Sequence, residues 1–170
     1  MLLEILAFTG LHNDVVDFNS DFLDTICEHF EHLEPIALPN KSLQNVSFLR
    51  TSEPSLENQR RYYHFLHLTF QEYFAARLFV RQWKAGQQLE CLQLKEESIE
   101  KLSPIHFLQR YKYSTRYNIL WRFVAGLLET QRADMVQFFE ALEEPPDLLG
   151  PAHQRLTMHC LSEVTHGNSP

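Results

Sequence analysis

Two histidines stand three residues apart in HFLHLTFQEYFAARLF, residues 64–79, where a strand-like run gives way to a helical pattern. Thr69 can cap that helix, and Glu72, three residues on, can reach back to it as in a capping box. His67 would then lie beside the positive end of a helix, where anions are favoured. The alternative is a structural histidine on a half-buried strand, because Thr69 and Glu72 already occupy this helix end.

Other kinds of active site find little support. The form G-x-x-x-x-G-K-[ST] of a phosphate-binding loop does not occur in the chain, because none of its 5 glycines precedes a lysine. We therefore expect no Mg-ATP hydrolysis and no catalytic residue in this chain alone, and the local signatures of serine or cysteine hydrolases are also missing.

Two groups of histidine and cysteine could be considered for zinc. Zinc sites need four convergent ligands, usually in paired short spacings, and neither group supplies a convincing set. We expect no metal site and a half-buried cysteine beside surface histidines. The two groups are Cys27, His29 and His32, and His153, His159 and Cys160.

The segment QRYKYSTRYNILWR, residues 109–122, interleaves bases with aromatic residues, as nucleic-acid surfaces do. The competing interpretation is that the aromatic rings face a core and the bases face solvent or an acidic neighbour. The formal net charge of −7 favours the second interpretation. The helical candidate at 20–33, which could enter a DNA groove, carries acids and no lysine or arginine, so phosphates would repel it.

Composition describes a globular, helix-rich chain. Its 170 residues are 44% hydrophobic, which is enough for one or two small domains with a core. The 3 cysteines are widely spaced and form no C-x-x-C pair, so a reducing, cytoplasmic environment is expected. No apolar run of about 18 residues occurs, so no membrane contact is expected. The first residues lack the basic start of a secretory signal, so an intracellular protein is expected.

Periodicity predicts a mainly α protein with one small β-hairpin. Ser20 is expected to cap a helix over 21–33, and two strands over 45–50 and 61–68 to form the hairpin. Both faces of the second strand are largely apolar, so we expect it to be covered on both sides. A nearly all-round apolar helix follows to Trp83 and is expected to be buried where two subdomains meet.

The expected domains are a winged-helix-like unit over 1–83 and an all-helical domain over 84–170, which could begin a helical repeat. Within the second unit, Ser103 and Pro104 form a strong helix start, and short connections suit antiparallel helices.

The stretch 65–76 resembles the winged-helix signature of NACHT-type STAND NTPases, the NOD-like receptor superfamily. The family pattern F-x-H-x-[ST]-F-Q-E-[FY]-x-A-A is matched at every specified position. The residues over 2–11 and 107–128 resemble neighbouring segments of such proteins, so the resemblance covers roughly residues 1–130. The matching positions are Phe65, His67, Thr69, Phe70, Gln71, Glu72, Tyr73, Ala75 and Ala76.

The resemblance implies that His67 contacts the β-phosphate of ADP bound to an NTPase core and helps to hold a closed, inactive state. It implies ADP or ATP with Mg in a parent protein, homo-oligomerisation on activation, and a role in signalling such as innate immunity. Thr69 and Glu72 would cap the helix, while Phe65, Phe70 and Phe74 would pack it. The phosphate loop, the Mg-binding acidic motif and the first helical domain of the family are missing, so the chain is expected to be a fragment.

Two alternatives remain from the residues alone. One is a stand-alone helical interaction adaptor with no link to a nucleotide. The other, weaker, is a winged-helix nucleic-acid binder, for which salt-dependent DNA binding would be diagnostic.

Overall fold

The computed structural model describes residues 1–30, 48–51, 62–129, 131–145 and 150–165. Within these ranges the chain is mainly helical, with two small antiparallel hairpins, so the predicted fold class is confirmed. Both predicted strands, 45–50 and 61–68, fall partly outside the described residues, as does His32. The predicted helix 21–33 ends earlier than expected, at His29, with Phe30 as its C-cap.

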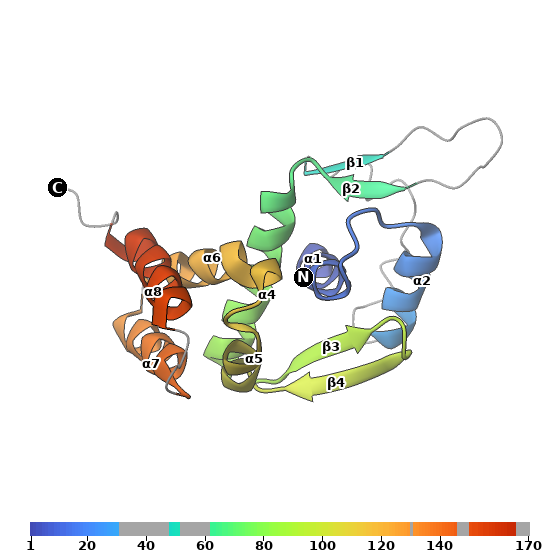
Figure 1. Ribbon diagram of the computed structural model, residues 1–170. Coiled ribbons are helices and arrows are strands. Elements are labelled where there is room, and N and C mark those ends of the chain that lie inside the picture. The colour runs from blue at the N-terminus through green and yellow to red at the C-terminus, as the bar shows by residue number, and fades with distance from the viewer. Residues whose placement is uncertain (31–47, 52–61, 130, 146–149, 166–170) are drawn as a thin grey trace.

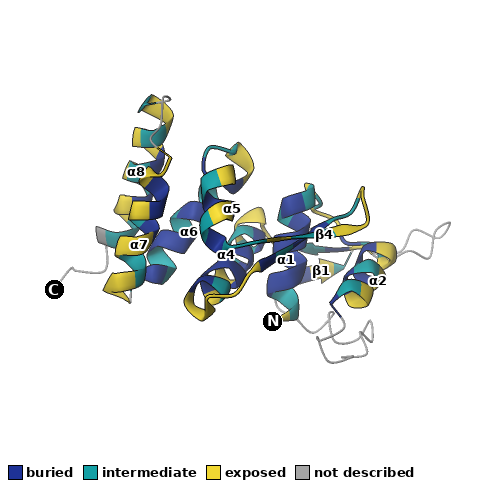
Figure 2. Ribbon diagram, turned by 90° about the horizontal axis from the view of Figure 1, so that it is seen from below, coloured by how far each residue is buried: buried dark blue, intermediate teal, exposed yellow. Residues whose placement is uncertain are grey.

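Helix α4 (Leu68–Ala85) is the centre of the molecule, with α1 (Leu2–Asn13) on one side and α6 (Asn118–Leu128) on the other (Figure 1). The sides on which these helices face one another are buried (Figure 2). Glu4 of α1 is buried and forms ion pairs with two arginines of α4, 3.2 Å to Arg77 and 2.6 Å to Arg81. The all-round apolar pattern of 70–83 is explained by this position, because α4 packs against helices on two sides.

The first hairpin pairs β1 (Leu49–Thr51) with β2 (Tyr63–Phe65), in the register Leu49 to Phe65. Phe18, in the segment before α2 (Ser20–His29), forms a β-bridge to Tyr63. The expectation that β2 is covered on both sides is wrong. Tyr63 and Phe65 are 1% and 4% exposed, but Tyr62, on the opposite face, is 39% exposed. Only one face of this narrow hairpin packs against the core.

The cap of α2 is also displaced from its predicted residue. Asn19 rather than Ser20 caps this helix, and its side-chain oxygen accepts a hydrogen bond from the N–H of Phe22 at 2.8 Å. Asparagine and serine are about equally good caps, so local sequence did not distinguish them.

A second hairpin occupies part of the region that we predicted to be all-helical. Strands β3 (Leu89–Gln93) and β4 (Ser98–Leu102) pair antiparallel, which corrects the expectation for 84–170. Asn13 at the end of α1 donates to the carbonyl of Leu92 at 2.8 Å and accepts from the N–H of Leu94 at 3.0 Å. The strand is thus stabilised by a partner far away in sequence, whose influence a local pattern does not reveal.

Helices α7 (Arg132–Glu143) and α8 (Gly150–Thr165) pack against α6 on the side away from α4, and α5 (Pro104–Tyr111) packs against α4 and α7 (Figure 1). The predicted start of α5 is confirmed, since Ser103 caps the helix by accepting from His106 N–H at 3.2 Å and Pro104 is its first residue. A short 3₁₀ helix, η1 (Thr115–Tyr117), leads into α6. The ring of Phe107 anchors the core between α1, α4 and α6, where it contacts the rings of Phe8, His12, Phe79, Tyr111, Tyr117 and Trp121.

Candidate functional site at the start of helix α4

His67 is itself the cap of α4. Its backbone is extended, with φ −148° and ψ 147°, and the helix begins at the next residue, Leu68. Its Nδ1 accepts a hydrogen bond from the backbone N–H of Thr69 at 3.2 Å and lies 2.8 Å from the Thr69 hydroxyl oxygen. The predicted capping box of Thr69 and Glu72 is therefore wrong. Because the helix starts earlier, Thr69 is inside the first turn and Glu72 lies beyond the position from which a capping box is made.

This cap determines which nitrogen of the neutral imidazole carries the proton. A backbone N–H can only donate, so Nδ1 of His67 must be the acceptor, and the proton of the neutral ring is on Nε2. His67 is exposed, and Nε2 has no hydrogen-bond partner among the residues that the structure describes. The site thus presents a fixed N–H donor to the surface at the start of a helix.

Two exposed apolar side chains flank His67. The two neighbours of His67 in sequence, Leu66 and Leu68, are 42% and 53% exposed. Single exposed leucines are common on protein surfaces, but here two flank an oriented hydrogen-bond donor. Such an arrangement suits contact with another protein surface better than contact with water alone.

The aromatic residues of the motif pack around the first turns of α4. Phe65 and Phe74 are buried with ring centroids 5.8 Å apart. Phe70 packs against Phe48 at 5.1 Å, and Tyr73 meets Phe123 of α6 edge-on at 5.5 Å. These contacts fix the direction of α4 where it leaves β2, and with it the position of His67.

Gln71 joins α4 to the end of α1. Its side chain is 3% exposed and its amide donates to the carbonyl of Val15 at 2.9 Å. This contact passes beside Gly10, where a Cβ atom would lie 2.6 Å from Gln71 Nε2. The Phe18 ring and the Val15 carbonyl would lie 2.7 and 2.9 Å from the same Cβ, so only glycine fits here without displacing its neighbours.

A pocket of about 370 Å³ opens beside this junction. Its charged side chains are Asp14, Glu72 and Arg116, and it is also lined by Gly10, Leu11, Val15, Val16, Leu68, Gln71 and Thr115. Burial raises the pKa of the Glu72 carboxyl, and a proton added to the His67 ring would act in the opposite direction. Sequence reasoning missed this pocket because Arg116 is far from α4 in the chain, and no local pattern pairs them.

His12, in the last turn of α1, is a buried histidine that the sequence did not single out. Nδ1 of His12 is 2.7 Å from the hydroxyl of Tyr117, and its Nε2 is 2.9 Å from Nε2 of Gln93. Because the amide nitrogen of Gln93 can only donate, Nε2 is the acceptor and the ring is neutral. Burial, with the positive charge of Arg116, lowers the pKa of His12 below its ordinary 6.5.

Neither histidine and cysteine group forms a metal site among the described residues, which hold no cluster of three metal-binding side chains. His29 contacts the carbonyl of Thr25, and Cys27 is exposed. Burial raises the pKa of the Cys160 thiol to about 12, which disfavours the thiolate that zinc requires.

The aromatic side chains of 109–122 pack in the core and two of its arginines pair with acidic residues, as predicted by the interpretation that excludes a nucleic-acid surface. Tyr117 and Trp121 are buried in the core. Arg110 pairs with Glu100 at 2.6 Å, and Arg122 pairs with Glu163 of α8.

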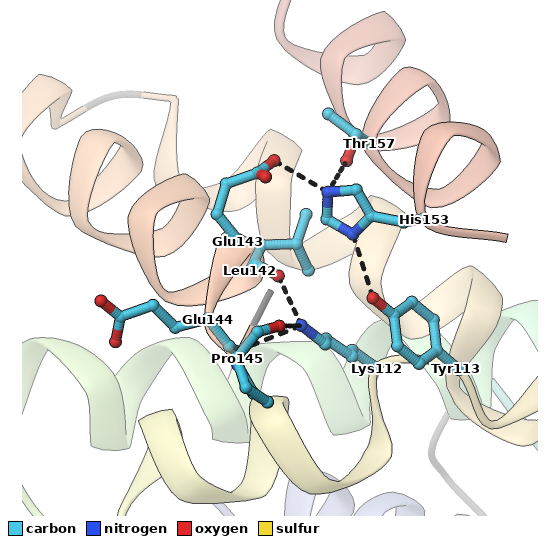
Figure 3. A network of polar contacts seen from close by, with 8 residues as sticks. All are labelled: Lys112, Tyr113, Leu142, Glu143, Glu144, Pro145, His153 and Thr157. Atoms are coloured by element: carbon cyan, nitrogen blue, oxygen red, sulfur yellow. Dashed lines mark hydrogen bonds and ion pairs between the residues drawn. The ribbon is translucent and has the colours of Figure 1, made fainter. Parts of the chain in front are cut away.

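Lys112, in the same segment, is buried at the end of α7 (Figure 3). Its ammonium donates to the carbonyls of Leu142, Glu144 and Pro145 at 2.8, 3.1 and 3.2 Å, where a cation is favoured by the helix dipole. Beside it, His153 of α8 bridges the hydroxyl of Tyr113 and the carboxylate of Glu143.

The chain matches none of the known protein-family models and none of the curated proteins with which it was compared. Among the described residues, no helix is both long enough and apolar enough to cross a membrane.

Proposed function

We propose that this chain is a regulatory module of a NACHT-type signalling NTPase, in which His67 contacts the β-phosphate of ADP carried by an NTPase core. The contact would hold the closed state, and its loss on nucleotide exchange would permit oligomerisation. The proposal rests on the resemblance of residues 65–76 and on one structural observation, the exposed Nε2–H of a ring whose other nitrogen is engaged in the cap.

The chemistry of this donor suits a phosphate. A phosphate oxygen accepts hydrogen bonds strongly, and the first turn of α4 adds a favourable dipole for an anion. The cap also holds the ring in one orientation, which reduces the entropy lost on binding. No further protein group is needed to select the tautomer, because the backbone N–H of Thr69 does so.

The place of α4 in the fold supports a role in transmission. This helix begins at the donor and packs against α1 and α6 along its length. A shift at its first turn would therefore reach both halves of the module. The contact acts as a switch only through its difference between the closed and open states. A charge-assisted hydrogen bond contributes about 1.5–3 kcal/mol, which is enough to change the ratio of states about tenfold or more.

The test must separate capping from phosphate contact. Asparagine is a good cap whose short side chain can still accept from Thr69 N–H, but it lacks an atom at the place of Nε2. We therefore expect His67→Asn, in a longer protein that includes the NTPase core, to retain the thermal stability of the wild type and to retain less ADP through purification. Thr69→Ser is the matched control and should retain ADP. Wild-type ADP retention by His67→Asn would contradict the proposal.

A further inference from the structure

We propose that the pocket between the end of α1, the first turn of α4 and η1 is a docking site for an arginine side chain of a partner protein. Glu72 is the central acceptor, and Val16 and Leu68 cover the arginine stem. This inference does not depend on a nucleotide contact of His67, because it concerns a different group of residues and needs no NTPase core.

The charges of the pocket favour a cation. Two carboxylates, Asp14 and Glu72, line it together with one guanidinium, that of Arg116. Arg116 is already engaged, since it donates to the carbonyl of His12 at 2.6 Å and lies 3.8 Å from Asp14. An anion would therefore compete with existing contacts of Arg116 and meet the charge of Glu72.

Glu72 is the acceptor that lacks a partner. It is half-buried, and no ion pair or hydrogen bond joins its carboxylate to another residue that the structure describes. His67 does not form an ion pair with it, because the Nδ1 atom of this neutral ring is engaged in the cap. Burial of an unpaired carboxylate is unfavourable, as the raised pKa of Glu72 indicates, so a cation that paired with it would gain more than at an open surface.

Two helix ends meet at the pocket and their dipoles oppose one another, because the first turn of α4 favours an anion while the end of α1 favours a cation. The pocket is lined by Gly10, Leu11 and Asp14, which belong to the last turn and C-cap of α1. Carbonyl groups at the end of a helix carry partial negative charge and favour cations. Arg116 itself shows that this helix end accepts a guanidinium, through the carbonyl of His12.

The apolar walls select the kind of cation. Val16 and Leu68, both lining the pocket, are 45% and 53% exposed, and they offer a surface to the methylene stem of a long side chain. Arginine suits the site better than lysine, because its planar guanidinium pairs with a carboxylate through two parallel hydrogen bonds and is more weakly hydrated. The volume, about 370 Å³, is at the lower end of the range for small-ligand sites, about 300–1,000 Å³.

The experiment is an NMR titration of the ¹⁵N-labelled chain with the blocked peptide acetyl-Ala-Leu-Arg-Leu-Ala-amide. Two further peptides replace the arginine with citrulline, its neutral isostere, or with lysine. We expect saturable shifts of the backbone amides of Val15, Val16 and Leu68 to Glu72. We expect the citrulline peptide to bind about tenfold or more weakly, because it loses a charge-assisted pair of hydrogen bonds, and the lysine peptide to bind more weakly than the arginine peptide.

Glu72→Gln should reduce the affinity for the arginine peptide about tenfold, while Glu140→Gln, at an exposed carboxylate of α7, should leave it unchanged. Asp14→Asn is the second variant. Asp14 has a positive φ of 61°, which asparagine tolerates, so this variant should fold and bind more weakly. Equal binding of the arginine and citrulline peptides, wild-type binding by Glu72→Gln, or no saturable shift at the pocket would each overturn the proposal. Equal binding of the lysine peptide would overturn the assignment to arginine.

Discussion

Gly10 of α1 and Gln71 of α4 approach so closely that a Cβ atom on Gly10 would lie 2.6 Å from the side-chain nitrogen of Gln71. It would also lie 2.7 Å from the ring of Phe18 and 2.9 Å from the carbonyl of Val15. The end of the Gln71 side chain could move aside, but the Phe18 ring and the Val15 carbonyl are held within the fold, so a side chain at position 10 would displace them.

We expect Gly10→Ala to lower the free energy of unfolding by about 1–3 kcal/mol, the usual effect of overpacking a core. Gly126 of α6 is a matched control, because the nearest atom to a Cβ there is 3.8 Å away. Gly126→Ala should raise the free energy of unfolding by about 0.5–1 kcal/mol, since alanine is the better helix former. Urea unfolding measures both, and equal effects of the two substitutions would contradict the close contact at Gly10.

His12 should make the stability of the protein depend on pH. Its pKa is lowered in the folded state, chiefly by burial and then by Arg116, while Glu100 acts in the opposite direction. The unfolded chain therefore binds a proton more readily, and the free energy of unfolding should fall as the pH decreases below the ordinary value of 6.5 towards the folded pKa.

His12→Gln provides the comparison, because glutamine can still hydrogen-bond but does not titrate. We expect the loss of stability between pH 7.5 and 5.5 to be smaller in this variant than in the wild type, as measured by urea unfolding at each pH. An identical loss in the two proteins would mean that other groups account for the pH dependence.

Lys112 should contribute to stability rather than to binding. Lys112→Met removes three hydrogen bonds and leaves carbonyls at the end of α7 without a buried donor, so the free energy of unfolding should fall by about 2–3 kcal/mol. Lys101, whose side chain is 58% exposed and pairs with Glu90, is the control. Its substitution by methionine should change stability by no more than about 0.5 kcal/mol, and a similar effect at both positions would contradict the role of the buried ammonium.

The arrangement of the basic segment predicts no DNA binding. Arg110 and Arg122 are paired with carboxylates and Lys112 is buried, so few cations remain for phosphates in this segment. We expect the chain to pass through a double-stranded DNA column at about 50 mM salt, where phosphate contacts are strong. Retention that decreases with salt would instead support the winged-helix nucleic-acid binder.

The sequence predicted the helices that are specified by residues close together in the chain. The helix after His67 follows from its periodicity, and the start of α5 follows from Ser103 and Pro104. The β3–β4 hairpin did not follow, because LECLQL is compatible with a helix or a strand and its position depends on Asn13 of α1.

At the candidate site, too, only the features set by neighbouring residues could be predicted. His67 could be singled out from the stretch 64–79, but its capping role could not, because Thr69 is a more usual cap than histidine. The pocket could not be predicted, since it requires Arg116 of η1 to meet the first turn of α4 and the end of α1.

The most direct test of the central claim is the distance from Nε2 of His67 to the nearest phosphate oxygen in a structure of the longer protein with ADP bound. The account predicts a hydrogen bond of about 2.7–3.2 Å to the β-phosphate, with Nδ1 still accepting from Thr69 N–H. A His67 ring directed into solvent, or packed against protein with no phosphate within hydrogen-bond distance, would contradict it.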